Sequence, residues 1–353
     1  MPINQAELKS FCHKMPKVDI HCHLMGTIRK ETMEQLAAKN SADVSQEEVE
    51  SYYIRGEKPV GVLHILRQLE REILKTPDDL RRITYEYLED CAKHNVRHTE
   101  FFYNFTGLMN HTDNSYGELQ AGLLTGIADA RTDFGISSHL IPAIDREADP
   151  QFAVQLVENI IQNRDDDVLG IGIDYSEIKY PPELFHDAYK LAREAGLKTT
   201  AHAGEFGTPW TNVQTALDDL QVDRLDHAYT ILDNPELTQR CIDERMVITV
   251  VPTNSYYLRT LAPEEWAQKH PIRSMGKAGL LIHPNTDDPT FHLTDPTNVW
   301  VSMVEHFGYD MADLRTFMLN GIEGSWVDQS TKDEWAKNWA AEFDQLRGQE
   351  FTA

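Results

Sequence analysis

Residues 17–27 read KVDIHCHLMGT, a mostly apolar segment that ends in two histidines. Alternate residues of a strand face the same side, so we expect His21 and His23 to point one way and Cys22 the other. A doubly wound parallel sheet would instead carry a glycine-rich phosphate loop directly after its first strand. The two histidines therefore favour a different parallel fold, and imidazole is the commonest metal ligand near neutral pH.

Seven further short apolar segments follow, separated by longer amphipathic segments, a pattern typical of βα units. The eight predicted strands are residues 17–23, 96–103, 136–143, 168–174, 197–202, 224–227, 247–251 and 280–285. Amphipathic segments that predict helices include residues 150–163, 182–195, 210–220 and 234–244. The long interval from 26 to 95 predicts several extra helices that cap the barrel mouth.

Eight successive βα units predict an α/β fold of the (β/α)8 TIM-barrel type, with extra helices between the first and second strands. No linker or internal repeat divides the chain, so one domain is expected over residues 1–353. Active sites of such barrels lie at the carboxyl ends of the strands.

Three further motifs fall at predicted strand ends. His202-Ala203-Gly204-Glu205 ends the fifth strand, Asp226-His227 ends the sixth, and NTDDP (residues 285–289) follows the eighth. A carboxylate beside a metal-bound water suits general acid/base chemistry, and Gly204 lets the backbone pass close to a ligand.

Each motif also has an ordinary structural explanation. Glu205 could be a solvated loop residue, His227 a hydrogen-bonded loop histidine, and Asp288 before Pro289 a helix cap. Taken together, however, the motifs would all lie on one barrel face. Three histidines and a carboxylate form a ligand set suited to zinc.

These residues resemble the adenosine deaminase family of the amidohydrolase superfamily. The matching motifs are KVDIHCHLMGT (17–27), VRHTEFFY (96–103), GIGIDYSE (170–177), AHAGE (201–205), RLDHAY (224–229) and NTDDP (285–289). The resemblance implies one zinc ion per chain, bound by His21, His23, His202 and Asp287.

The resemblance also implies hydrolytic deamination of an aminopurine, with catalytic roles for three residues. Glu205 would donate a proton to ring nitrogen N1, and His227 would orient or deprotonate the attacking water. Asp288 would hydrogen-bond the ring at N7 and help to position the nucleophile. For Glu205 to serve as an acid, its pKa should be raised by a dry pocket.

Two departures from the family pattern concern the substrate. Met25 stands where nucleoside-binding members carry an aspartate that contacts ribose, and Ser176-Glu177 resembles the adenine deaminase branch. We therefore expect Met25 and Glu177 at the substrate, with Glu177 accepting a hydrogen bond from N9–H of a free base. A loop or helix-start carboxylate is the alternative for Glu177.

Alternative functions remain open at this stage. They are an amidohydrolase acting on another amino-heterocycle or an N6-substituted adenine, a two-metal hydrolase, and a non-catalytic binding barrel. A bridging lysine at the end of the fourth strand, which two-metal members usually need, is absent from the sequence. His98-Thr99-Glu100 supplies the HxE of cytidine-deaminase-type enzymes, but no PCxxC follows, so that class is excluded.

The composition constrains the partners and the compartment. The formal net charge is −24, which disfavours nucleic acid and anionic membranes and favours a small-molecule substrate. Four dispersed cysteines and the lack of an apolar leader predict a cytoplasmic protein without a disulfide framework. Barrel enzymes often associate, so a homo-oligomer is compatible with the sequence, although no interface signature stands out.

Overall fold

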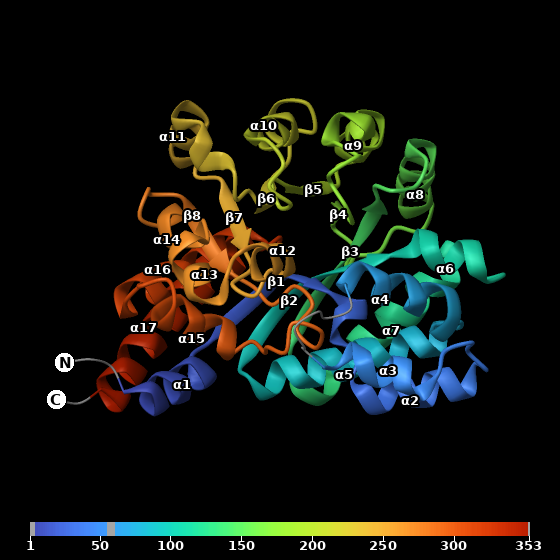
Figure 1. Cartoon of the computed structure of the whole chain (residues 1–353), viewed down its shortest axis with the longest axis horizontal. Coiled ribbons are helices and arrows are strands. Elements are labelled where there is room, and N and C mark those ends of the chain that lie inside the picture. Colours follow the sequence, from blue (N-terminus) through green and yellow to red (C-terminus); the bar gives the residue numbers. More distant parts are fainter. Residues whose placement is uncertain (1–3, 55–60, 352–353) are drawn as a thin grey trace.

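The computed structural model describes residues 4–54 and 61–351, and its centre is an eight-stranded parallel barrel (Figure 1). The strands follow one another in chain order, each hydrogen-bonded to the next. They are β1 Lys17–His23, β2 Val96–Asn104, β3 Ser137–Asp145, β4 Gly170–Asp174, β5 Lys198–Ala203, β6 Arg224–His227, β7 Val247–Val250 and β8 Leu281–Pro284. The predicted barrel is confirmed, and every predicted strand lies within two residues of an observed one.

Helices lie between the strands and around the barrel. The α-helices are α1 Gln5–Lys14, α2 Lys30–Lys39, α3 Gln46–Tyr52, α4 Val62–Gln68, α5 Pro77–Lys93, α6 Phe105–His111, α7 Tyr116–Phe134, α8 Pro150–Gln162, α9 His186–Glu194, α10 Trp210–Asp218, α11 Pro235–Asp243, α12 Ser255–Thr260, α13 Pro263–Lys269, α14 Ile272–Met275, α15 Asn298–Glu305, α16 Met311–Gly324 and α17 Gln329–Glu350. Short 3-10 or π turns are η1 Leu24–Thr27, η2 Leu69–Ile73, η3 Pro182–Phe185 and η4 Ile231–Asp233. The single helix predicted over 182–195 is thus divided into η3 and α9.

The interval between β1 and β2 holds the predicted extra helices, α2 to α5, which gather on one side of the barrel (Figure 1). Helix α5 begins at a capping box, in which Thr76 accepts from the N–H of Asp79 and the Asp79 carboxylate accepts from the N–H of Thr76. It packs along α7 on the outside of the barrel. Of this group, α4 reaches the mouth of the barrel.

The strands are buried on both faces, as expected for a parallel sheet covered by helices. Inside the barrel, Arg224 forms a buried ion pair with Glu100, with 2.5 Å between Nη1 and Oε2. The Arg224 guanidinium also lies over the ring of Trp326. Arg224 Nη1 also donates to the carbonyl of Gly324 at 3.0 Å, so the pair links β2, β6 and the end of α16.

The first and last helices, α1 and α17, lie against each other (Figure 1). Phe11 of α1 packs edge-on against Phe343 of α17, with ring centroids 4.9 Å apart. All four cysteines are buried as free thiols, in keeping with the predicted lack of a disulfide framework. Within the described residues, none of the helices is long and apolar enough to span a bilayer.

Candidate active site

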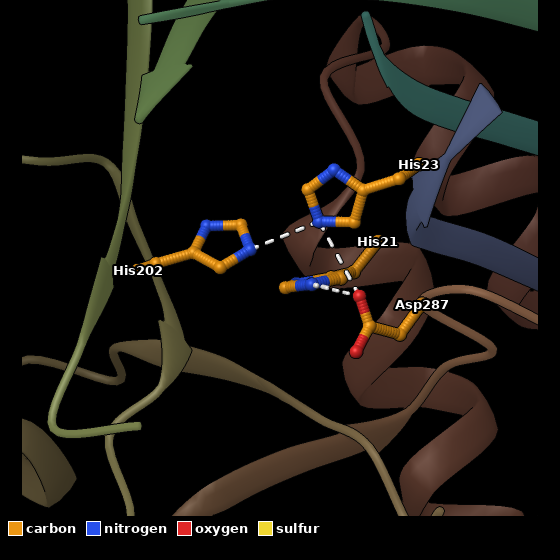
Figure 2. Close-up of side chains that lie close together, drawn as sticks. All are labelled: His21, His23, His202 and Asp287. Carbon is orange, nitrogen blue, oxygen red and sulfur yellow. Dashed lines mark hydrogen bonds and ion pairs between the residues drawn. The ribbon is translucent and has the colours of Figure 1, made fainter. Parts of the chain in front are cut away.

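Four side chains that are distant in sequence converge at the carboxyl ends of the strands (Figure 2). His21 and His23 come from β1, His202 from β5 and Asp287 from the segment after β8. One ligand atom from each lies within 4.8 Å of all the others. The structure therefore brings together the four residues predicted as metal ligands.

The distances among these atoms suit a single ion. His23 Nε2 lies 3.1 Å from His202 Nε2 and 3.3 Å from Asp287 Oδ1, and His21 Nε2 lies 3.6 Å from Asp287 Oδ1. Ligands placed about 2.0–2.1 Å from a tetrahedral zinc ion are about 3.3 Å from one another. His21 Nε2 is buried and has no hydrogen-bond partner among the described residues, as expected for an atom that faces a metal.

Asp226 lies behind two of the imidazoles. Its Oδ1 is 3.2 Å from His21 Nδ1, and its Oδ2 is 3.6 Å from His202 Nδ1. The hydroxyls of Thr200 and Thr249 each donate to this carboxylate at 2.7 Å. A carboxylate on the far nitrogen of a histidine fixes the ring and leaves Nε2 free to bind metal.

Protonation in the cluster follows from burial and charge. Burial lowers the pKa of His23 to about 4 and holds the pKa of His202 well below its ordinary value. Burial also lowers the pKa of His21, but the charges of Asp226 and Asp287 outweigh it and raise that pKa to about 10. A proton on His21 Nε2 and a cation at the centre of the cluster would repel each other, so a bound cation would replace that proton.

The backbone around Asp287 closes the barrel between β8 and β1. Its N–H donates to the carbonyl of His21 at 3.0 Å, and its carbonyl accepts from the N–H of His23 at 2.8 Å. Asp287 has a φ of 63°, in the left-handed region that a non-glycine residue rarely adopts. The contacts that close the barrel therefore also place the carboxylate ligand.

Asp288 lies next to Gly26, and the contact requires glycine. A Cβ at position 26 would lie 2.1 Å from Asp288 Oδ1. Asp288 is buried, and Oδ1 has no hydrogen-bond partner in the described part of the chain. Burial and the neighbouring charges of Asp287 and Glu205 raise the pKa of Asp288 well above its usual range.

Glu205 lies beside the four convergent side chains, in the loop after β5. Its Oε1 accepts a hydrogen bond from Asn254 Nδ2 at 2.9 Å, and its Oε2 is 3.7 Å from His227 Nε2. Burial, with the nearby charge of Asp287, raises the pKa of Glu205 to about 8. The raised pKa favours the protonated carboxyl group, which is the form that a general acid needs.

His227 contacts the same cluster from β6. Its ring centroid is 4.8 Å from those of His21 and His202. Burial lowers its pKa to about 3, so the ring is neutral at pH 7. It adopts a φ of 64°, which turns the chain sharply at the end of the strand.

A cavity of about 120 Å³ opens at this end of the barrel. The candidate chemical groups Glu205, Asp287 and Asp288 lie in its wall, together with His23 and His202. Apolar side chains also line it, namely Val62, Leu63 and Leu66 of α4 and Phe206. Apolar walls around a few convergent polar groups are typical of a small-molecule site.

Three residues expected at the substrate lie elsewhere. Met25 is buried in the hydrophobic core within η1, not on the cavity wall. Gly204 has a φ of 71°, and a Cβ there would lie 2.6 Å from Thr230 Oγ1. The conformation and packing of the loop therefore require glycine at this position, which is not on the cavity wall. Glu177 is 1% exposed, and its carboxylate accepts from the N–H groups of Gly204 and Glu205, so the structure does not support a contact with N9–H.

Other cavity residues were not predicted as site residues. Asp174, at the end of β4, has Oδ2 3.6 Å from His23 Nδ1. Tyr175 follows with a φ of 67°, and its hydroxyl donates to Glu70 at 2.6 Å. The Arg67 guanidinium lies 3.7 Å from the centre of the Tyr175 ring, which ties α4 to the end of β4. The sequence feature that could have identified Asp174 and Tyr175 is their position at the carboxyl end of an apolar strand.

The sequence model of the adenosine deaminase family matches residues 16–340 of this chain. The chain is 30% identical to the adenine deaminase of Vibrio parahaemolyticus, covering 93% of this chain and 96% of that protein. It is also 30% identical to the adenine deaminase of Acinetobacter baylyi, covering 98% of this chain and all of that one.

Two solved structures have the same fold. An amidohydrolase from Burkhoderia ambifaria with bound zinc is 56% identical, with a TM-score of 0.97, covering 99% of this chain and 96% of that chain. The adenine deaminase of Arthrobacter aurescens is 26% identical, with a TM-score of 0.84, covering 94% of this chain and 99% of that chain. The match over nearly the whole barrel, together with the convergent histidines and aspartate, means that this chain belongs to the adenosine deaminase family.

Proposed function

We propose that the protein is a zinc-dependent aminopurine deaminase, which converts a 6-aminopurine and water into a 6-oxopurine and ammonia. The observation that carries the proposal is the position of Glu205, whose pKa is raised to about 8, on a cavity wall shared with His23, His202 and Asp287. Adenine deaminases related over nearly the full chain, and a related amidohydrolase with bound zinc, support it.

His21, His23, His202 and Asp287 would hold one zinc ion. When bound, zinc would lower the pKa of a water ligand to about 7 and so supply a nucleophile at neutral pH. Asp226 keeps the rings of His21 and His202 in orientation from behind.

Glu205 supplies the proton that the ring needs. As a C–O bond forms at C6, the protonated carboxyl donates to N1, so negative charge does not accumulate on the purine. His227, neutral and adjacent, takes a proton from the attacking water, and this proton passes to the departing amino group. The C6–N bond then breaks and ammonia leaves. The hydroxyl group of the tetrahedral intermediate gives its proton to the Glu205 carboxylate, which returns Glu205 to its protonated form.

Asp288 orients the ring. Its raised pKa favours the protonated form of the carboxyl group, and Oδ1 is buried without a hydrogen-bond partner among the described residues. A protonated carboxyl can donate to N7, which is an acceptor in a 6-aminopurine. The apolar side chains of α4 and Phe206 would cover the ring and exclude water.

The test is a panel of 6-aminopurines, assayed for ammonia release and for the change in ultraviolet absorbance. We expect free bases to exceed nucleosides, because the cavity of about 120 Å³ is small beside the roughly 300–1,000 Å³ of drug-sized sites. Activity confined to N6-substituted adenines or to another amino-heterocycle would identify the alternative substrates within the same chemistry. If the zinc-loaded protein releases ammonia from no aminopurine, the proposal fails.

Glu205→Gln separates an enzyme from a binding protein. The amide keeps the shape but cannot donate an acidic proton, so we expect turnover to fall by about 100- to 10,000-fold while zinc content stays unchanged. Full turnover in this variant would remove Glu205 from the mechanism.

A further inference from the structure

Glu177 forms a buried connection between two loops of the barrel mouth. It follows β4, and its side chain reaches the loop after β5. Oε1 accepts from the backbone N–H of Gly204 at 2.8 Å and from Asn212 Nδ2 at 2.7 Å, and Oε2 accepts from the backbone N–H of Glu205 at 3.1 Å. Three donors thus surround a carboxylate that is 1% exposed.

Two of these donors are successive backbone N–H groups, which point in opposite directions in an extended chain. The φ of 71° at Gly204 turns the chain so that both face the carboxylate. Hydrogen bonds from N–H groups to a carboxylate are stronger than neutral ones, and burial without them would be costly. The pairing therefore fixes the backbone on which Glu205 stands.

The side chain of Glu205 is held by a different residue from the one that holds its backbone. Asn254, which follows β7, donates to Oε1 at 2.9 Å. Glu177 thus holds the backbone of Glu205 and Asn254 holds its carboxyl group. Glu177 does not line the cavity, so any effect on the reaction must act through Glu205.

We infer that Glu177 is a positioning residue for Glu205, holding the loop so that the carboxyl group stays aimed into the cavity. The inference of a role in turnover rests on the proposed function, whereas the holding of the loop does not. An error of about 1 Å in the position of a reacting group can cost about 100-fold in rate, so a loop anchor has a measurable effect.

Glu177→Gln is the sharpest variant, because the shape is kept while one acceptor oxygen becomes an NH2 group. That group would face a backbone N–H, so at least one loop hydrogen bond is lost. We expect kcat to fall about 10- to 100-fold with KM changed less than about threefold and zinc retained. Glu183→Gln, an exposed change of the same kind on η3, is the matched control.

The pH profile gives a readout that general loosening would not move. The titratable groups near Glu205 are Asp287, Asp288, His227, His21 and Glu177, and the negative charge of Glu177 contributes to the raised pKa of Glu205. Replacing it with an amide should therefore shift the alkaline limb of kcat to lower pH. Glu177→Asp, which keeps the charge, should leave the limb in place and recover part of kcat.

Amide hydrogen exchange tests the anchor without reference to turnover. In Glu177→Gln, exchange should quicken in the peptide that contains Gly204 and Glu205, and not in a peptide from α17. Unchanged exchange there, or an unchanged kcat in an active enzyme, would overturn the inference. If the native enzyme turns over no aminopurine but exchange of the Gly204–Glu205 peptide quickens in Glu177→Gln, the holding of the loop by Glu177 is supported and the proposed function is contradicted. Should Glu177→Gln fail to fold, Glu177→Asp is read in the same way: faster exchange supports the anchor, and unchanged exchange contradicts it.

Discussion

The Nε2 atoms of His23 and His202 lie 3.1 Å apart, although 179 positions separate the two residues in the chain. Without a metal, one of these two nitrogens can donate its N–H to the other. When neither carries a proton, the same spacing lets both bind one cation, together with His21 and Asp287.

Removal of one ligand should therefore release the metal. In His202→Ala we expect zinc affinity to fall by more than about 100-fold and deaminase activity to fall with it. Metal analysis of the purified variant and a chelator titration of the native protein measure this. Native zinc content in the variant would mean that the ion is held elsewhere.

Asp226 should matter although it does not touch the ion. Asp226→Asn removes the charge behind His21 and His202, so we expect zinc affinity to drop about 10- to 100-fold. Competition with a fluorescent zinc chelator measures the change. Asp243→Asn, at an exposed helix end, is the control, and equal zinc affinity in both variants would contradict the role.

The activity should decline on the alkaline side. Glu205 acts in its protonated form, its pKa is raised to about 8, and the active form is lost as pH rises through that value. A cation bound at Asp287 offsets part of the charge that raises this pKa, so the limb should lie between 4.5 and about 8. The hydrogen bond from Asn254 lowers the same pKa, so Asn254→Ala should move the limb of kcat to higher pH. A shift to lower pH, or none, would show that the limb belongs to another group.

Gly26 should not tolerate a side chain. In Gly26→Ala the new Cβ would meet Asp288 at 2.1 Å, so we expect Asp288 to move and kcat/KM to fall by about 100-fold. Gly348→Ala is the matched control, because no atom lies within 4 Å of a Cβ there. Steady-state kinetics of the two variants, with thermal melts, decide the matter, and native kinetics in Gly26→Ala would refute the prediction.

The sequence by itself predicted the barrel and the histidines and acidic residues at the carboxyl ends of its strands, and the resemblance to the family implied which four of them are metal ligands. Apolar segments alternating with amphipathic ones have the period of βα units, and parallel strands in a barrel share one carboxyl-end face. The residues at the carboxyl ends of β1, β5, β6 and β8 therefore lie on the same face of the barrel, independently of the loop conformations. Glu205 and Asp288 lie within three residues of His202 and Asp287, and their catalytic roles were implied by the resemblance to the family.

Only the tertiary structure decided which neighbours support those groups. Met25 and Glu177 were expected at the substrate, yet one lies in the core and the other holds the loop of Glu205. Asp226 reaches the site from β6 and Asn254 from the segment after β7, and left-handed φ values at Tyr175, His227 and Asp287 redirect the chain. Periodicity fixes the face on which a strand residue lies. It does not fix the direction of a side chain after the strand ends, which depends on contacts between segments far apart in sequence.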